Sequence, residues 1–141
     1  RLASSAWVFG DADRLRQVLD NLLANARIHT DASVPVYVSV AVEHEAVILT
    51  VEDQGPGIDA KDADRVFDRF YRADASRSRT RGGAGLGLSI VASIVEAHDG
   101  TVDLVSAAGA GVRVTVALPR ANAPGSPSNV ADVATVLTGD D

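Results

Sequence analysis

The stretch VPVYVSVAVEHEAVILTVEDQGPGI, Val34 to Ile58, contains the pattern that decides the fold. Its first half alternates apolar and polar residues, which is the period of a half-buried strand. Its second half is apolar again after a short polar turn, so the two halves predict a β-hairpin. The second strand then ends at Asp53, which is followed by Gln54 and two glycines. A turn explains the glycines, but it does not explain why the strand ends in a carboxylate.

The segments around this hairpin predict an α+β fold. Apolar residues have helical spacing over residues 10–29, where Asp11 or Asp13 can cap the start, and again over residues 86–100, which end at a glycine. Residues 59–72 predict a shorter helix, and residues 101–106 and 111–119 predict two closing strands. We therefore expect two layers, with about three helices on one face of a mixed, mostly antiparallel sheet of about five strands.

The composition fits one compact domain and excludes several classes of protein. The chain has 141 residues, of which 46% are hydrophobic, and it has no cysteine for a disulfide or a thiolate metal site. The net charge of -6 argues against a general nucleic-acid binder. Residues 72–82 nevertheless hold four arginines against one aspartate, which suggests an anionic ligand nearby.

The two ends of the chain differ in character from its middle. We assign residues 1–120 to the domain, and we expect residues 121–141, which are rich in Ala, Pro, Ser and Gly, to be a mostly disordered tail in which VADVATVL could form a transient helix. The chain starts at Arg1 rather than Met, so we expect a fragment of a longer protein. Its sequence shows no signal peptide and no apolar run of the ~20 residues that span a bilayer.

Asn21 and Asn25 form the first of three polar clusters that interrupt the apolar patterns. They are four residues apart on the first long helix and therefore lie on one face. Their amide oxygens could bind a hard cation or its water molecules. The alternative is a pair of partly exposed polar residues.

The other two clusters are rich in glycine. An ionised Asp53 accepts hydrogen bonds only, so it could bind an exocyclic amine such as that of adenine, and Gly55 and Gly57 would let a flat ring approach the backbone. The alternative is an ordinary turn between a strand and a helix. In GGAGLGLSI, residues 82–90, glycines precede a helix N-terminus, which predicts an anion site. This stretch matches neither a Walker A loop nor the dinucleotide fingerprint. The simplest ligand for all three clusters is Mg-ATP.

Five motifs, in order, resemble those of a known family. The stretches RLRQVLDNLLANARIHT, DQGPGI, VFDRFYRAD, GGAGLGLSIV and AHDGTVDLVSAAGAGVRVTVALP resemble its N, G1, F and G2 boxes and its closing strands. The family is the catalytic ATP-binding domain of two-component sensor histidine kinases, whose Bergerat-type fold is shared with gyrase, Hsp90 and MutL. The resemblance extends from about Val8 to Pro119.

The resemblance implies a role for each matching position. Asn25 would ligate Mg²⁺ with help from Asn21, Asp53 would accept the adenine amine, and residues 72–84 would form a lid over the nucleotide. Asn21, Asn25 and the lid residue Arg77 would act in phosphoryl transfer. The remaining positions implied to bind the nucleotide are His29, Gly55, Gly57, Ile58, Arg81, Gly83, Gly85, Leu86 and Gly87.

Two positions depart from the pattern of the family. Ile28 stands where a lysine commonly contacts phosphate, and His29 stands where an aromatic residue lies near the base. Arg27 or a lid arginine could supply the lost charge. For Phe67 and Phe70 we prefer a role in the core beneath the lid.

The resemblance implies a phosphotransferase. The domain would bind Mg-ATP and donate the γ-phosphate to a histidine on a separate dimerisation and acceptor domain of the same full-length kinase, with a response regulator downstream. None of His29, His44 and His98 lies in the acceptor pattern of the family, so we expect this chain to bind ATP without phosphorylating itself. We also expect a monomer in the cytoplasm, at the cytoplasmic end of a membrane-anchored sensor, which contacts neither nucleic acid nor membrane.

Two alternatives stay open. One is an ATP-hydrolysing member of the same fold, of the gyrase or Hsp90 kind. Those enzymes need a glutamate base one turn before the metal-binding asparagine, and the chain has Asn21 there, whose neutral amide cannot take a proton from water. The other is a nucleotide-binding module that acts only through contacts.

Overall fold

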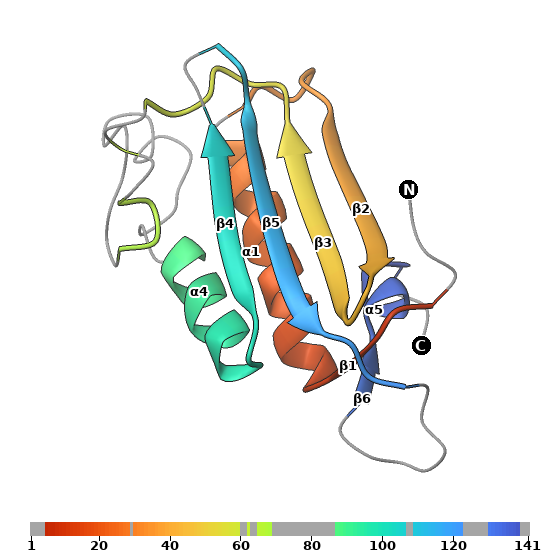
Figure 1. Ribbon diagram of the computed structural model, residues 1–141. Coiled ribbons are helices and arrows are strands. Elements are labelled where there is room, and N and C mark those ends of the chain that lie inside the picture. The colour runs from red at the N-terminus through yellow and green to blue at the C-terminus, as the bar shows by residue number, and fades with distance from the viewer. Residues whose placement is uncertain are drawn as a thin grey trace.

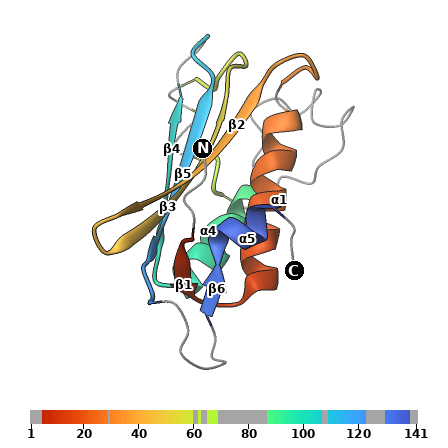
Figure 2. The same cartoon turned by 90° about the vertical axis from the view of Figure 1, so that its right-hand side faces the viewer.

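The computed structural model describes residues 5–28, 30–59, 62, 65–68, 87–106, 109–122 and 130–138, and it has two layers. One layer is a four-stranded sheet, and helices cover one of its faces (Figures 1 and 2). The expected α+β fold with helices on one face is therefore confirmed. The described helices and strands are β1 (Trp7–Phe9), α1 (Ala12–Ile28), β2 (Val36–Glu43), β3 (Ala46–Asp53), α4 (Gly87–Ala97), β4 (Thr101–Ser106), β5 (Val112–Pro119), β6 (Val130–Asp132) and α5 (Val133–Thr138).

The sheet has the strand order β2-β3-β5-β4, and each neighbouring pair is antiparallel. The two predicted hairpins, β2–β3 and β4–β5, are confirmed, and β3 pairs with β5 to join them at the centre of the sheet. Because Asp53 pairs with Val112 and Ala46 pairs with Pro119, the end of β3 lies beside the start of β5. The last residue of β3 therefore lies beside the turn that connects β4 to β5.

Alternate residues of the two central strands form the core. In β3 the buried positions are Val47, Leu49, Val51 and Asp53, and in β5 they are Val112, Val114, Val116 and Leu118. The intervening residues are less buried, so the period of two places one apolar face against the helices. Asp53 continues this inward-facing series, which carries a carboxylate to the border of the apolar core.

The first helix, α1, is capped at its start and packs an apolar stripe against the core. The Asp11 carboxylate accepts hydrogen bonds from the backbone N–H groups of Asp13 (2.8 Å) and Arg14 (3.4 Å), so Asp11 is the N-cap of the two candidates. The buried residues of the helix are Leu15, Val18, Leu19, Leu22 and Ala26. The polar residues between these apolar ones therefore lie at the edge of the core.

The second long helix, α4, ends in a Schellman motif. Asp99 has a φ of 58°, and the N–H of Gly100 donates to the carbonyl oxygen of Val95 at 2.9 Å. Gly100, predicted as the helix stop, is needed for a different reason. A Cβ at this position would lie 2.5 Å from the carbonyl oxygen of Ala117 and 2.7 Å from Leu118. Close packing of the helix end on β5 therefore excludes a side chain there.

The expectation of a disordered tail over 121–141 is wrong for residues 130–138. These residues form β6 and α5, and β6 pairs with β1 in a second, two-stranded antiparallel sheet. Ala131 and Val133 join the main core, and α5 contacts α1. The Asp132 carboxylate accepts hydrogen bonds from the N–H groups of Ala6 (2.9 Å) and Ala134 (3.0 Å). Asp132 therefore caps α5 and fixes it to the beginning of β1.

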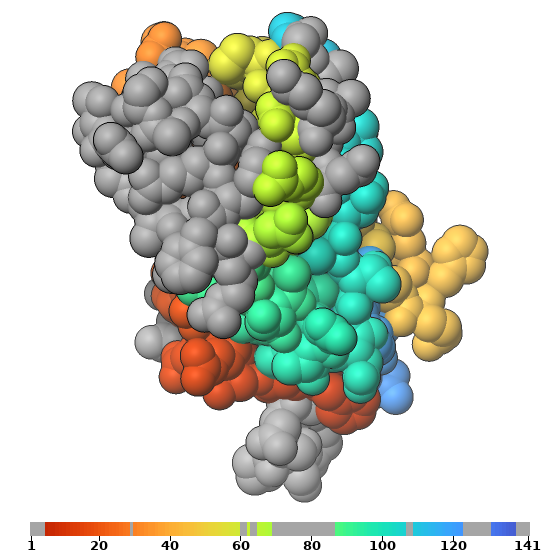
Figure 3. All heavy atoms as spheres, turned by 90° about the vertical axis from the view of Figure 1, so that its left-hand side faces the viewer, coloured from red at the N-terminus to blue at the C-terminus, as the bar shows by residue number. Residues whose placement is uncertain are grey.

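The short helix expected over 59–72 lies largely outside the described residues. Among the described ones, Arg65 and Asp68 take part in turns, in which their N–H groups donate to the carbonyl oxygens of Asp62 and Arg65 at 3.0 Å. Val66 is buried, and Phe67 packs against the core as expected. Residues 65–68 lie on the molecular surface beside α4 (Figure 3). Phe70 is not among the described residues.

Candidate functional site

Asp53 is the buried acidic residue of the candidate site. Its side chain is 5% exposed, and its Oδ1 accepts a hydrogen bond from the backbone N–H of Gly55 at 2.9 Å. Within the part of the chain that the structure describes, its Oδ2 has no hydrogen bond. Among the described residues, Oδ2 is not one of the fully buried side-chain atoms without a partner, so it keeps some exposed surface that a donor can reach. The carboxylate is therefore suited to receive one more donor from a ligand.

The backbone that follows Asp53 has the geometry that its glycines predict. Gly57 has a φ of 78°, a conformation that other residues rarely adopt, and Gly55 is buried. Ile58 is 5% exposed and belongs to the core. The segment from Asp53 to Ile58 thus turns sharply, and its last residue, Ile58, packs in the core.

Sequence reasoning predicted the turn between β4 and β5 but missed that this turn holds the segment from Asp53 to Ile58. The N–H of Ile58 donates to the Ser106 hydroxyl oxygen at 2.7 Å, and the same hydroxyl donates to the carbonyl oxygen of Gly111 at 2.7 Å. The N–H of Gly109 donates to the carbonyl oxygen of Pro56 at 2.5 Å. These residues are far apart in sequence, so periodicity and local motifs carry no signal for their contact.

Gly111 allows the backbone of this turn to approach Asp53. Its φ is 74°, and a Cβ there would overlap the carbonyl oxygen of Asp53 and lie 3.1 Å from its carbonyl carbon. Gly109 has a φ of 79° but no described atom within 4 Å of an added Cβ. The two glycines of the AAGAG stretch therefore serve different purposes: Gly109 makes the turn, and Gly111 makes room for the end of β3.

Asn21 and Asn25 lie four residues apart on α1, and both are half-buried beside the apolar stripe. Among the described residues, the buried Nδ2 of Asn21 has no hydrogen-bond partner. A buried amide donor without a partner is unfavourable by about 1–3 kcal/mol. It is suited to donate to an anionic oxygen or to an ordered water molecule. Both residues are partly exposed, so the alternative of two partly exposed polar residues stays open, and the unpartnered Nδ2 of Asn21 is the observation that favours a ligand.

Several of these features lie at one end of the domain. The end of β3, the beginning of β5 and the C-terminal half of α1 are at this end, and α4 begins on the same side of the sheet (Figure 1). Gly87 is the first residue of α4, and an added Cβ would have no described atom within 4 Å. The positions His29, Arg77, Arg81, Gly83, Gly85 and Leu86 lie outside the described residues.

The last turn of α1 departs from what was expected of Arg27. Its guanidinium donates to the carbonyl oxygen of Val34 at 3.1 Å, and its side chain is exposed. Thr30, which is 2% exposed, donates its hydroxyl to the carbonyl oxygen of Ala26 at 2.7 Å. Arg27 thus fixes the connection between α1 and β2, so it is a weaker candidate to replace the lysine missing at Ile28.

The donors available in this region fit a hard cation better than a soft one. Among the described residues, no group of three or more His, Asp or Glu side chains could hold a metal ion. Oxygen is the ligand that Mg²⁺ prefers, and this ion usually keeps water molecules and binds through phosphates rather than in an all-protein cage. The Asn25 amide oxygen, with the unpartnered Asn21 Nδ2 nearby on the same face, fits such an arrangement.

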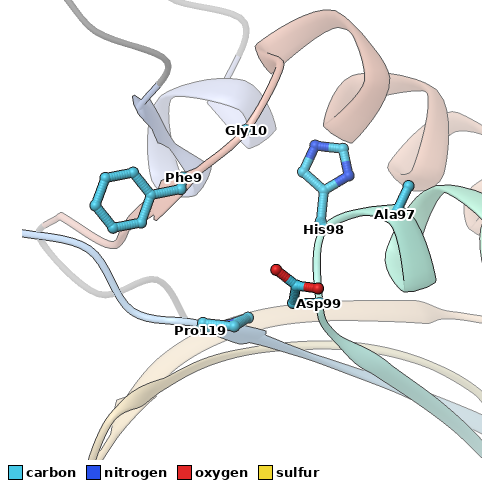
Figure 4. Close-up of a pocket in the computed structure, with 6 residues that line it drawn as sticks. All are labelled: Phe9, Gly10, Ala97, His98, Asp99 and Pro119. Atoms are coloured by element: carbon cyan, nitrogen blue, oxygen red, sulfur yellow. The ribbon is translucent and has the colours of Figure 1, made fainter.

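A separate hollow of about 400 Å³ lies at the opposite end of the sheet (Figure 4). Phe9 and His98 line it together with Gly10, Ala97, Asp99 and Pro119. The His98 Nε2 accepts a hydrogen bond from the N–H of Asp11 at 3.3 Å, and its Nδ1 lies 2.7 Å from the carbonyl oxygen of Ile94. This ring connects the end of α4 to the start of α1, and the hollow lies at the end of β5 away from Asp53.

The fold and these residues define a class of protein. The chain belongs to the family described as histidine kinase-, DNA gyrase B- and HSP90-like ATPases, whose model matches residues 10–122. Within the described residues, no helix has both the length and the apolar character needed to cross a bilayer.

The relatives narrow this class to sensor kinases. The chain is 42% identical over 118 residues to the signal transduction histidine-protein kinase BaeS of Escherichia coli, covering 84% of this chain and 25% of that protein. It is 50% identical over 100 residues to the probable sensor histidine kinase TcrY of Mycobacterium tuberculosis, covering 71% and 21%. The chain thus spans about a quarter or less of the length of these relatives.

Solved structures agree with this assignment. The mycobacterial sensor histidine kinase MprB matches with a TM-score of 0.72 and 29% identity, covering 87% of this chain and 82% of that one. Full-length ShkA in complex with AMPPNP matches with a TM-score of 0.68 and 33% identity, covering 79% of this chain and 22% of that one. The resemblance to the ATP-binding domain of histidine kinases is therefore confirmed.

Proposed function

We propose that this domain binds Mg-ATP and donates the γ-phosphate to a histidine on a separate helical acceptor domain of the same kinase. The observation that carries this proposal is the buried Asp53 carboxylate, which is held on one oxygen by Gly55 and has no described partner on the other. A ligand group that only accepts hydrogen bonds cannot pair with this carboxylate. An exocyclic amine can, because it brings a donor to a buried acceptor.

The second support is the amide pair on α1. Asn25 would hold Mg²⁺, and the unpartnered Nδ2 of Asn21 would donate to a phosphate oxygen or to a metal-bound water molecule. When bound, Mg²⁺ would neutralise phosphate charge. The protein's share of phosphoryl transfer is mainly to position groups and stabilise charge. Arg77 and Arg81 of the expected lid, Gly87 at the start of α4, and Gly83, Gly85 and Leu86 before it in the sequence remain our candidates for the phosphate contacts.

Hydrolysis is the weaker alternative. An ATPase of this fold needs a carboxylate base one turn before the metal ligand, and the side chain at that position is the half-buried amide of Asn21. A measurement of released phosphate tests it. Hydrolysis would be favoured if phosphate were released to water faster than it was transferred to the acceptor histidine. Binding without transfer to any supplied acceptor domain would favour a module that acts through contacts alone.

The partners follow from the proposed transfer. The acceptor domain would supply the histidine and the dimer contacts, and a response regulator would receive the phosphate from it. We expect the isolated domain to be monomeric and to work in the cytoplasm, where its nucleotide is found. A purified sample that acquires acid-labile phosphohistidine from labelled ATP without an acceptor domain would contradict this division of roles.

The experiment that tests the proposal compares Asp53→Asn with its neighbour Glu52→Gln. Both changes replace a carboxylate with an amide, but Glu52 lies on the other face of the sheet and is paired with Arg113 at 3.1 Å. Asp53→Asn places a donor opposite the adenine amine and should weaken ATP binding by about 100-fold, which corresponds to about 3 kcal/mol. Glu52→Gln should bind like the wild type. Equal affinities for the two variants would remove Asp53 from the site.

A further inference from the structure

The Ser106 hydroxyl occupies a junction between two segments that sequence reasoning treated separately. It accepts a hydrogen bond from the N–H of Ile58 and donates one to the carbonyl oxygen of Gly111, both at 2.7 Å. Ser106 is the last residue of β4, and Ile58 is the last residue of the candidate base-binding segment. The two residues are separated by 48 positions along the chain.

The segment that Ser106 holds needs such support. It runs from Asp53 to Ile58 through two glycines and a proline, and Gly57 has a φ of 78°. Glycine loses more backbone freedom on ordering than any other residue. An unsupported segment of this kind would be ordered only when a ligand binds, and the cost of ordering it would lower the affinity.

Three attachments fix the segment to the turn between β4 and β5. Besides the Ser106 bridge, the N–H of Gly109 donates to the carbonyl oxygen of Pro56 at 2.5 Å, and Gly111 packs directly on the backbone of Asp53. Gly111 is thus both an acceptor for Ser106 and the contact that supports Asp53. The hydroxyl therefore bonds directly to Ile58 and reaches Asp53 only through Gly111, which packs on the backbone of Asp53.

We propose that Ser106 is a positioning residue for base recognition. Its hydroxyl holds the segment from Asp53 to Ile58 in the binding geometry before the nucleotide arrives, and so it sets the preference for adenine through Asp53. The inference rests on the proposed function, since it assigns Ser106 to the same nucleotide site. Ser106 itself needs no contact with the nucleotide.

The test compares Ser106→Ala with Ser106→Thr, which keeps the hydroxyl, and with Thr101→Ala, which removes a hydroxyl from the other end of β4. Titrations use Mg-ATP and Mg-ITP, because inosine carries a carbonyl where adenine carries its amine. Ser106→Ala should weaken ATP binding about tenfold and lower the ratio of ATP to ITP affinity about fivefold. Ser106→Thr should restore both, and Thr101→Ala should change neither.

The affinity ratio separates positioning from general destabilisation. A variant that is merely less folded binds both nucleotides less by the same factor, so its ratio stays that of the wild type. An unchanged ratio in Ser106→Ala would therefore overturn the inference. If the wild type itself binds no Mg-ATP, the proposed function fails instead, which is a different result.

A measurement on the unaltered protein covers the case in which Ser106→Ala does not fold. Amide hydrogen exchange in the absence of nucleotide should be slower at Ile58 than at Gln54, which is exposed. Equal exchange rates at the two positions would show that the segment is not held before the ligand binds, and this would also overturn the inference.

Discussion

Replacement of Gly111 with alanine tests whether the turn between β4 and β5 supports Asp53. Gly109→Ala is its matched control, since both glycines belong to one turn and have φ values of 74° and 79°. Alanine in this left-handed conformation costs about 1–2 kcal/mol at either site. Only at Gly111 would the added Cβ also overlap the backbone of Asp53.

The overlap determines how much more stability Gly111→Ala loses than Gly109→Ala. The contact involves backbone atoms of β3, which cannot rotate away, and overpacking of this kind costs a further ~1–3 kcal/mol. We therefore expect the free energy of unfolding to fall by about 1–2 kcal/mol in Gly109→Ala and by about 2–5 kcal/mol in Gly111→Ala. A domain with about 5–15 kcal/mol of stability survives both changes.

Urea unfolding, followed by circular dichroism, measures the free energy of unfolding of each variant. A nucleotide titration at a urea concentration below the unfolding midpoint, where the variant is folded, measures its ATP affinity. The folded Gly111→Ala protein should also lose at least about tenfold in ATP affinity, because a shift of the Asp53 backbone moves its carboxylate. Gly109→Ala should keep its affinity within about threefold of the wild type. Equal losses of stability in the two variants would refute the packing argument, and full ATP affinity in Gly111→Ala would refute the link to Asp53.

Three further predictions concern other parts of the molecule. Asn25→Ala should reduce the difference between the ATP affinities measured with and without Mg²⁺, whereas Gln17→Ala on the same helix should leave this difference unchanged. If the difference persisted in Asn25→Ala, Asn25 would not be a metal ligand. Asp132→Ala should lower the free energy of unfolding by about 1–2 kcal/mol, because two backbone N–H groups lose their acceptor, and an unchanged urea midpoint would mean that the segment from β6 to α5 contributes little. Asp99→Gly should raise the urea midpoint by the equivalent of about 0.5–1 kcal/mol, since Asp99 has a φ of 58° at the end of α4, and a lower midpoint would contradict this.

Local patterns predicted the parts of the fold that depend on neighbouring residues. The alternation from Val36 to Val42 predicted the first hairpin, and the helical spacing of apolar residues predicted α1 and α4. Asp53 was singled out because a carboxylate at the end of an apolar strand is unusual. Asp53 is buried and accepts a hydrogen bond from Gly55, which fits either a ligand site or an ordinary turn, so its ligand role stays a prediction.

Contacts between residues that are far apart in the sequence could not be predicted from local patterns. The bond between Ser106 and Ile58, and the packing of Gly111 on Asp53, depend on the pairing of β3 with β5. The segment from β6 to α5 follows a stretch rich in Pro, Ser and Gly, which favoured a disordered tail. Its order instead comes from pairing with β1 and from the bond between Asp132 and Ala6, which lie 126 positions apart.

The most direct test of the account is a calorimetric titration of the purified chain with a non-hydrolysable ATP analogue, with and without Mg²⁺. The account predicts saturable one-to-one binding that Mg²⁺ strengthens, that Asp53→Asn weakens by about 100-fold and that Glu52→Gln leaves intact. Absence of binding by the folded wild type, or equal binding by Asp53→Asn, would contradict the central claim that Asp53 ends its strand in order to bind adenine.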